Sequence, residues 1–155
     1  SKADAELATK RAEIHANVLL AFYEVLVAQE RVTLAKSSVE VAESALDAAA
    51  KRVKAGKSSP VEQTKSNVAA ATAKIELVQA ATQLKNSRNR LSALWGDNAP
   101  SFEYVIGDVT SIPEVGSISE LQALMDVAPS VKLAQYEINA RDALTKIEHS
   151  KAIPN

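Results

Sequence analysis

The sequence contains no cysteine, which excludes disulfide bonds and thiolate metal sites and leaves the redox compartment open. Aromatic residues are also scarce, with two Phe, one Trp and three Tyr among 155 residues, so little material is available for a thick globular core. No stretch approaches the roughly 20 consecutive apolar residues of a membrane-spanning helix, and the first residues lack the apolar core of a signal peptide. We therefore expect a soluble protein or a soluble part of a larger one.

An excess of charge of either sign is lacking as well. The formal net charge is −1 and the isoelectric point is about 6.1. Such a chain has no overall positive field to attract phosphate backbones, which argues against nucleic acid as a partner.

Alanine, in contrast, is abundant, with 28 residues in the chain. Because alanine is the strongest helix former and has a small side chain, this bias favours helices whose backbones approach closely. Glycine and proline are absent from residues 1–55 and 61–95. We predict an all-α fold with long helices over 3–55 and 61–95, about 80 Å and 50 Å long at 1.5 Å per residue.

The first predicted helix carries a seven-residue repeat, which is typical of coiled coils. Large residues recur in one row and mostly small ones in a second row, three or four residues away. The first row contains Val18, Val25, Val32, Val39, Leu46 and Val53, and the second contains Ile14, Ala21, Ala28, Ala35, Ala42 and Ala49. In the second helix we expect the partner rows to be Val61, Val68 and Ile75, and Leu77, Leu84 and Leu91.

The junction between the two helices has strong local signals. Gly56 suits the left-handed position after a helix, and Ser59, Pro60 and Glu62 supply an N-cap, a first-turn proline and a capping-box acid. A connection over residues 56–60 is so short that it predicts an antiparallel coiled-coil hairpin.

The rest of the chain predicts smaller elements. We expect a small irregular segment over 97–116 with at most one short strand, a short helix over 117–127 opened by a Ser117–Glu120 capping box, and a last helix over 129–152 that stops before Pro154. Residues 1–155 would then form a single helical domain.

Residues for catalysis or metal binding are sparse. His15 and His149 are far apart in sequence and neither has a second ligand at helical spacing, so we expect surface histidines and no metal site. Ser58 and Ser59 have no nearby base, and a capping role accounts for them better than a nucleophilic one. We therefore expect that the chain binds no cofactor and is not an enzyme.

Two apolar groups leave alternatives open. Trp95, Phe102 and Tyr104 could line a ligand pocket, although a small local core is the better interpretation. An enzymatic pocket around residues 95–127 would need convergent titratable groups whose pKa values are shifted by their neighbours. Asp97, Glu103 and Asp108 have no histidine or lysine neighbour in sequence that could do this. At the turn, Val53, Ala55 and Val61 either close the hairpin or contact a partner.

Residues 52–96, which read RVKAGKSSPVEQTKSNVAAATAKIELVQAATQLKNSRNRLSALWG, resemble the helical hairpin of TolC-type outer-membrane efflux proteins. Residues 21–35 and 129–155 are similar to the family's descending and climbing helices. The Ser-Pro-Val-Glu turn and the LWGDNAPSF sequence are most similar to the heavy-metal-resistance, CzcC-like branch.

The resemblance implies a periplasmic helical portion of an outer-membrane channel from a Gram-negative bacterium, without the barrel strands that would reach the membrane. It implies a homotrimeric tunnel that works in a tripartite system, with a periplasmic adaptor and an inner-membrane pump of the resistance-nodulation-division type, and that exports heavy-metal cations. The adaptor would bind at the hairpin tip, through Arg52, Val53, Ala55, Gly56, Lys57, Ser58, Ser59, Pro60 and Val61. The alternatives are a periplasmic adaptor hairpin and a free-standing coiled-coil scaffold.

Overall fold

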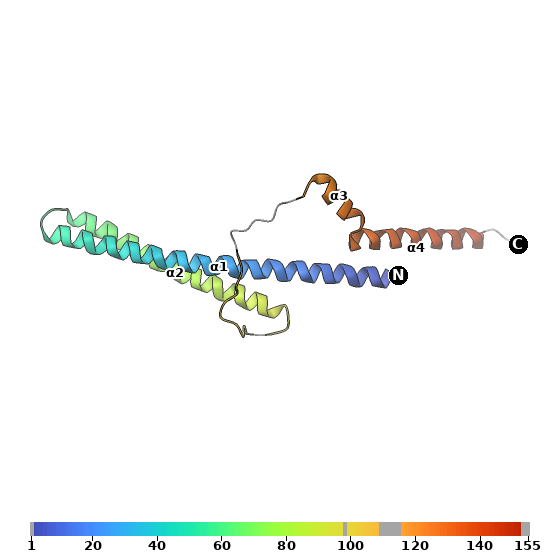
Figure 1. Cartoon of the computed structure of the whole chain (residues 1–155), viewed down its shortest axis with the longest axis horizontal. Coiled ribbons are helices and arrows are strands. Elements are labelled where there is room, and N and C mark those ends of the chain that lie inside the picture. The colour runs from blue at the N-terminus through green and yellow to red at the C-terminus, as the bar shows by residue number, and fades with distance from the viewer. Residues whose placement is uncertain (1, 98, 109–115, 153–155) are drawn as a thin grey trace. The chain divides into compact units, whose positions relative to one another are not determined.

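The computed structural model describes residues 2–97, 99–108 and 116–152, and within these residues it contains four helices and no strand (Figure 1). The helices are α1 (Lys2–Lys54), α2 (Pro60–Ala93), α3 (Ile118–Asp126) and α4 (Pro129–Ala152). The predicted all-α fold with a long antiparallel hairpin and additional helices is confirmed. Pro154, at which we expected the last helix to stop, lies outside the described residues.

The chain divides into two compact units, one made of Val18–Ser111 and the other of Ser1–Asn17 with Ile112–Asn155. Helix α1 contributes to both. The expected single domain over 1–155 stays a prediction.

In the unit Val18–Ser111, α1 and α2 form the hairpin, and the α1 rows behave as the repeat predicts. From Val18 to Val53 every member of both rows is buried or half-buried, including Val25 at 0% exposure, Ala28 at 3% and Ala49 at 1%. Ile14 is the exception at 57% exposure, because the pairing of α1 with α2 ends near Ala21, which packs beside Leu91 close to the end of α2.

The prediction for α2 was half wrong. Leu77, Leu84 and Leu91 are buried or half-buried, but Val61, Val68 and Ile75 are 58%, 61% and 58% exposed. The row that faces α1 beside the leucines consists of small residues instead. It contains Ser66, Ala73, Ala80 and Ser87. Small side chains fill this row because the helices approach closely there, and valines at these positions would push them apart.

Two ion pairs flank the seam of the hairpin. The Lys74 ammonium lies 2.7 Å from the Glu43 carboxylate, and Arg90 lies 2.9 Å from Glu24. Glu43 and Lys74 each lie just beyond the small-residue row of their helix, whereas Glu24 and Arg90 each precede the large-residue row. The pairs therefore lie on opposite sides of the seam, as in an antiparallel coiled coil, and support its register.

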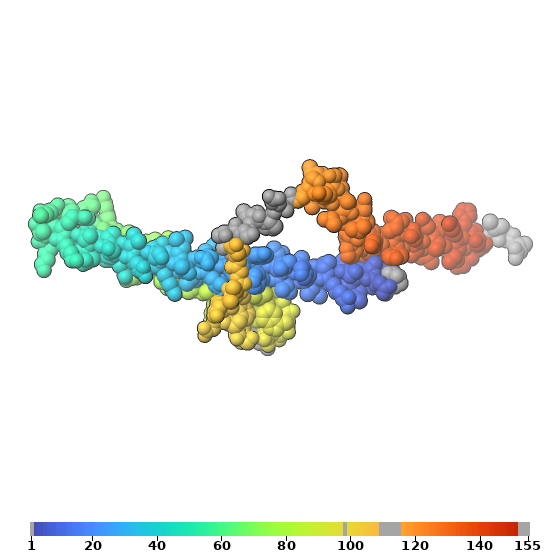
Figure 2. Space-filling view, in the orientation of Figure 1, coloured from blue at the N-terminus to red at the C-terminus, as the bar shows by residue number. Residues whose placement is uncertain are grey.

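At the end of the hairpin away from the tip, residues 99–108 form an extended crossing segment that lies on the surface of α1 (Figure 2). Gln29 binds it through two hydrogen bonds. Its amide Nε2 donates to the Val105 carbonyl at 3.0 Å, and the Val105 N–H donates to Gln29 Oε1 at 2.8 Å. At Gly107, an added Cβ would lie only 2.6 Å from Leu26 Cδ1, so the glycine permits this close approach.

The crossing segment completes the main apolar cluster of the unit, here called the base cluster. Its buried members are Ala21, Val25 and Leu91, and Phe22, Leu84, Phe102 and Val105 pack against them. The small local core expected around Trp95, Phe102 and Tyr104 forms only in part. Phe102 joins it and its ring lies 6.0 Å from that of Trp95, but Trp95 is half-exposed and Tyr104 is 66% exposed.

The second unit contains the first turns of α1, together with α3 and α4. The Ser117 hydroxyl accepts from the Glu120 N–H, and the Glu120 carboxylate accepts from the Ser117 N–H, so the predicted capping box is present. Lys2 pairs with Glu137 at 3.2 Å, and Ala5 is buried. Most other side chains of α3 and α4 are exposed in the chain as described, among them Leu124, Leu144 and Ile147.

Candidate partner-docking site at the hairpin tip

The turn between α1 and α2 is built as a Schellman motif, which fixes how its residues are presented. The Lys57 N–H donates to the Arg52 carbonyl and the Gly56 N–H to the Val53 carbonyl, each at 2.9 Å. Gly56 has φ +70°, and nothing lies within 4 Å of where its Cβ would be. Glycine is therefore favoured here for its backbone conformation and not for lack of space.

Helix α2 begins with a partial version of the expected cap. Ser59 is extended at φ −72° and ψ 144°, and its hydroxyl accepts from the Val61 N–H at 3.3 Å, with Pro60 as the first helical residue. The capping-box role expected of Glu62 is not seen among the described contacts, since its carboxylate lies 3.8 Å from Lys65. Both serines precede the helix, and only Ser59 has a capping contact among the described residues.

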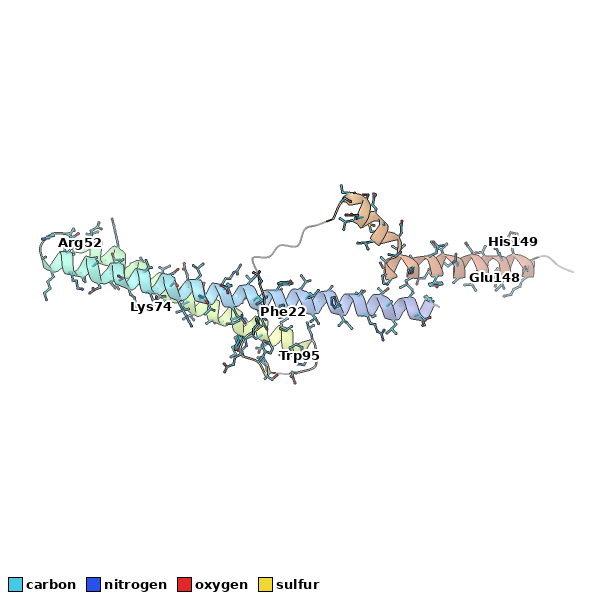
Figure 3. The ribbon with its side chains drawn as sticks, in the orientation of Figure 1. Phe22, Arg52, Lys74, Trp95, Glu148 and His149 are labelled. Carbon is cyan, nitrogen blue, oxygen red and sulfur yellow. The ribbon has the colours of Figure 1, made fainter. Side chains whose placement is uncertain are left out.

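The nine residues predicted as the docking site, which we call the tip, lie together at the closed end of the hairpin, where Figure 3 labels Arg52. Val53 and Ser58 are half-buried and the other seven are exposed, Val61 by 58%. Val53 ends the large-residue row of α1, so hairpin closure accounts for it. Ala55 and Val61 are apolar groups that the hairpin itself leaves in water.

The tip is also rich in positive charge. Lys51, just before it, pairs with Asp47, four residues earlier. Within the described residues, no ion pair involves Arg52, Lys54 or Lys57. Directly beside the tip, an open groove between the two helices is lined by Glu43, Leu46, Asp47, Ala50, Pro60, Gln63, Thr64 and Asn67. A partner that extends beyond the turn could contact this groove.

Sequence reasoning missed two residues that organise the opposite end. Arg88 places its guanidinium 5.6 Å from the centre of the Phe102 ring and donates from Nη2 to the Phe102 carbonyl, and Gln29 holds Val105. The contacts of Gln29 span 76 residues of sequence. Figure 3 shows Phe22 and Trp95, which mark this end of the hairpin, far along the rod from Arg52.

Outside the tip, little of the described chain suggests ligand chemistry. His15 and His149 are both exposed, as expected. Among the residues that the structure describes, no three His, Asp or Glu side chains gather in a way that could hold a metal ion. In the same residues, none of the helices combines the length and the apolar character needed to span a bilayer.

Comparison with known proteins gives the class of the chain. The sequence model of the family described as outer membrane efflux protein matches residues 1–97, more than half of the chain. The chain therefore belongs to the outer membrane efflux protein family. It is similar to the cobalt-zinc-cadmium resistance protein CzcC of Cupriavidus metallidurans, with 39% identity over 153 residues. No solved structure matches the chain significantly.

The alignment with CzcC covers 99% of the chain but 37% of the relative's length, so the chain spans little more than a third of that protein. The resemblance to the heavy-metal branch of the family, first made from the turn and the end of the second helix, is confirmed. The comparisons do not favour the adaptor hairpin or the free-standing scaffold.

Proposed function

We propose that this chain is the periplasmic helical portion of an outer-membrane efflux channel protein that exports heavy-metal cations as part of a tripartite system. Membership of the outer membrane efflux protein family supports the channel, and the similarity to a cobalt-zinc-cadmium resistance protein supports the class of substrate. The function is mechanical, without a cofactor and without chemical change to the substrate, so the chain is not an enzyme.

The observation that carries this proposal is a set of apolar rows that the hairpin does not bury. On α1, Leu20, Val27, Leu34 and Val41 recur every seven residues and are 65%, 43%, 69% and 70% exposed. On α2, Val68 and Ile75, also seven residues apart, are 61% and 58% exposed. Seven-residue rows are the pattern that packs helices side by side, and exposed rows of this length mark a contact surface.

We assign these rows to contacts with further hairpins, which would close the wall of a tunnel in a homotrimer. Each hairpin would then use one seam internally and its outer rows for its neighbours. The small-residue seam suits this arrangement, because closely spaced helices make a thin, stiff wall.

The tip would meet the periplasmic adaptor, which links the channel to an inner-membrane pump of the resistance-nodulation-division type. Helix-on-helix packing around the exposed Ala55 and Val61 would supply the contact. The fixed Schellman turn supports this role, since a preorganised surface loses little conformational entropy on binding.

A pull-down with the adaptor of the same efflux system tests the docking. Val61→Asp changes the centre of the tip but keeps the fold, since an acid in the first turn of a helix is compatible with its dipole. We expect this variant to lose most adaptor binding with unchanged helicity. Val78→Asp, at a position 66% exposed and about 25 Å further along α2, is the matched control and should bind normally. Equal binding by both variants would refute the docking role of the tip.

Growth in metal salts tests the substrate. A strain that lacks the gene should become sensitive to cobalt, zinc or cadmium, and the gene should restore tolerance whereas the Val61→Asp version should not. Unchanged tolerance to all three metals in the deletion strain would contradict heavy-metal export.

A further inference from the structure

Positive charge is concentrated in and directly around the tip, in a chain that is slightly acidic. Lys51, Arg52, Lys54 and Lys57 fall within residues 48–61, and this stretch contains no Asp or Glu. Because the whole chain has a net charge of −1, the four positive charges leave −5 for all other residues. The hairpin therefore ends in a positive cap on an otherwise negative chain.

Local structure explains only part of this cap. Lys51 is neutralised by Asp47, and Arg52 and Lys54 lie in the last turn of α1, where cations offset the negative end of the helix dipole. Lys57 lies between the two helix ends, three residues after Lys54 and three before Pro60. The negative end of α1 and the positive end of α2 oppose each other there, so the helix dipoles do not account for a cation at this position.

The acidic residue nearest to the turn on α2 does not compensate these charges. Glu62 lies beside Lys65, and no ion pair within the described residues joins it to Arg52, Lys54 or Lys57. All three side chains are exposed. These three cations are exposed and close together in sequence, and the described ion pairs give none of them an acidic partner, so a partner with negative charge would stabilise them.

We propose that the face of the partner that meets the tip is acidic, with carboxylates arranged around an apolar centre that covers Ala55 and Val61. This inference rests on the proposed docking of the adaptor and specifies the chemistry of that adaptor's contact surface. The positive cap steers the two proteins together and sets their orientation, and the apolar centre supplies the packing.

An anionic membrane is the other surface that a basic tip could bind, and the tip composition disfavours it. Segments that insert into a lipid surface present Trp, Phe or Leu beside their cations. The largest apolar residues of the tip are Val53 and Val61, and Val53 is half-buried in the hairpin seam.

Charge reversal tests the proposal, with binding of the chain to the purified adaptor measured at about 50 and 300 mM NaCl. Lys54→Glu with Lys57→Glu reverses two of the three exposed charges of the cap. Lys36→Glu with Lys85→Glu makes the same change in net charge at exposed positions away from the tip. We expect wild-type affinity to fall about tenfold as salt rises, and the tip variant to lose about tenfold at low salt with a weaker salt dependence. The control pair should change affinity less than twofold.

The outcomes separate this inference from the function on which it rests. If Val61→Asp abolishes binding while the tip charge reversal and salt have no effect, the adaptor docks at the tip but its face is not acidic, and the inference is overturned. If the wild-type chain does not bind the adaptor at either salt concentration, the docking function itself fails and the inference with it. If vesicles containing phosphatidylglycerol bind the chain as tightly as the adaptor does, and the tip reversal abolishes that binding, the partner is a lipid surface and the proposal is wrong.

Discussion

The two ends of the hairpin bury side chains of different size. The base cluster uses large side chains, among them Val25, Leu91 and Phe102, and the crossing segment adds hydrogen bonds through Gln29. Toward the tip, the buried residues are alanines, Ala49, Ala70 and Ala73, and Leu46 and Leu77 are only half-buried. Buried apolar area per residue, and with it stability, is therefore concentrated at the base.

This difference explains how a narrow hairpin can hold the residues of its tip in a fixed arrangement. Alanines contribute little burial energy but allow the helix backbones to run close together, so the tip half stays slender. The base anchors the hairpin, and the Schellman turn fixes the residues at its far end. Substitutions at the two ends should therefore differ in size and in what they disturb.

The largest effect is expected in the base cluster. Leu91→Ala should lower the free energy of unfolding by about 2–4 kcal/mol, because it removes a 4%-exposed side chain and leaves a cavity against Val25. Chemical denaturation followed by circular dichroism measures this. Leu34→Ala, at a position 69% exposed, is the control and should cost much less in the isolated chain. Equal losses would mean that the base is not the stable end.

In the tip half, adding volume should be more harmful than removing it. Ala49→Leu places a large side chain at a position 1% exposed and should cost about 1–3 kcal/mol, since the helices must separate to accept it. Its neighbour Ala48 is exposed, so Ala48→Leu should be nearly neutral by the same denaturation assay. A neutral Ala49→Leu would show that the seam is looser than described.

Half of the seam could be predicted from the sequence and half could not. On α1, the two predicted rows are the ones that the structure buries, although Leu20, Val27, Leu34 and Val41 also recur every seven residues and stay exposed. On α2, both Val61–Val68–Ile75 and Ser66–Ala73–Ala80–Ser87 repeat every seven residues, and periodicity alone does not say which row faces the partner helix. Hydrophobicity alone favoured the row of Val61, Val68 and Ile75 as the one that faces α1. The small residues take that position instead, because they allow the helices to approach closely.

The crossing segment was beyond prediction for another reason. Gln29 and Arg88 are polar residues in helices, with no local sequence signal for contacts to residues 102 and 105. The tip, in contrast, followed from local rules, because Gly56 and Ser59 carry their structural roles in their own chemistry. Whether its nine residues bind a partner stays a prediction.

The polar attachment at the base should give an intermediate effect. Gln29→Leu removes both hydrogen bonds to Val105 and should cost about 1–2 kcal/mol. The Val105 amide should then exchange with solvent faster, which hydrogen exchange detects. Gln79→Leu, at an exposed position of α2, should leave that exchange unchanged. If Val105 stays protected in the Gln29 variant, other contacts hold the crossing segment.

The smallest effect is expected at the turn. Gly56→Ala should cost about 1 kcal/mol, because φ +70° is strained for a residue with a Cβ even in open space. Gly56→Asn should cost less, since asparagine tolerates this conformation. Thermal unfolding distinguishes the two variants, and the reverse order would contradict the conformational explanation.

The central claim is that the tip, and not the base, contacts the adaptor. These 155 residues contain no cysteine, so a single introduced cysteine offers one attachment point for a photo-reactive cross-linker within them, in cells that make the whole efflux system. Two exposed positions compare the ends, Ala55 at the tip and Tyr104 on the crossing segment. We predict adaptor cross-links from Ala55→Cys and none from Tyr104→Cys. Adaptor cross-links from Tyr104→Cys with none from Ala55→Cys would contradict this account.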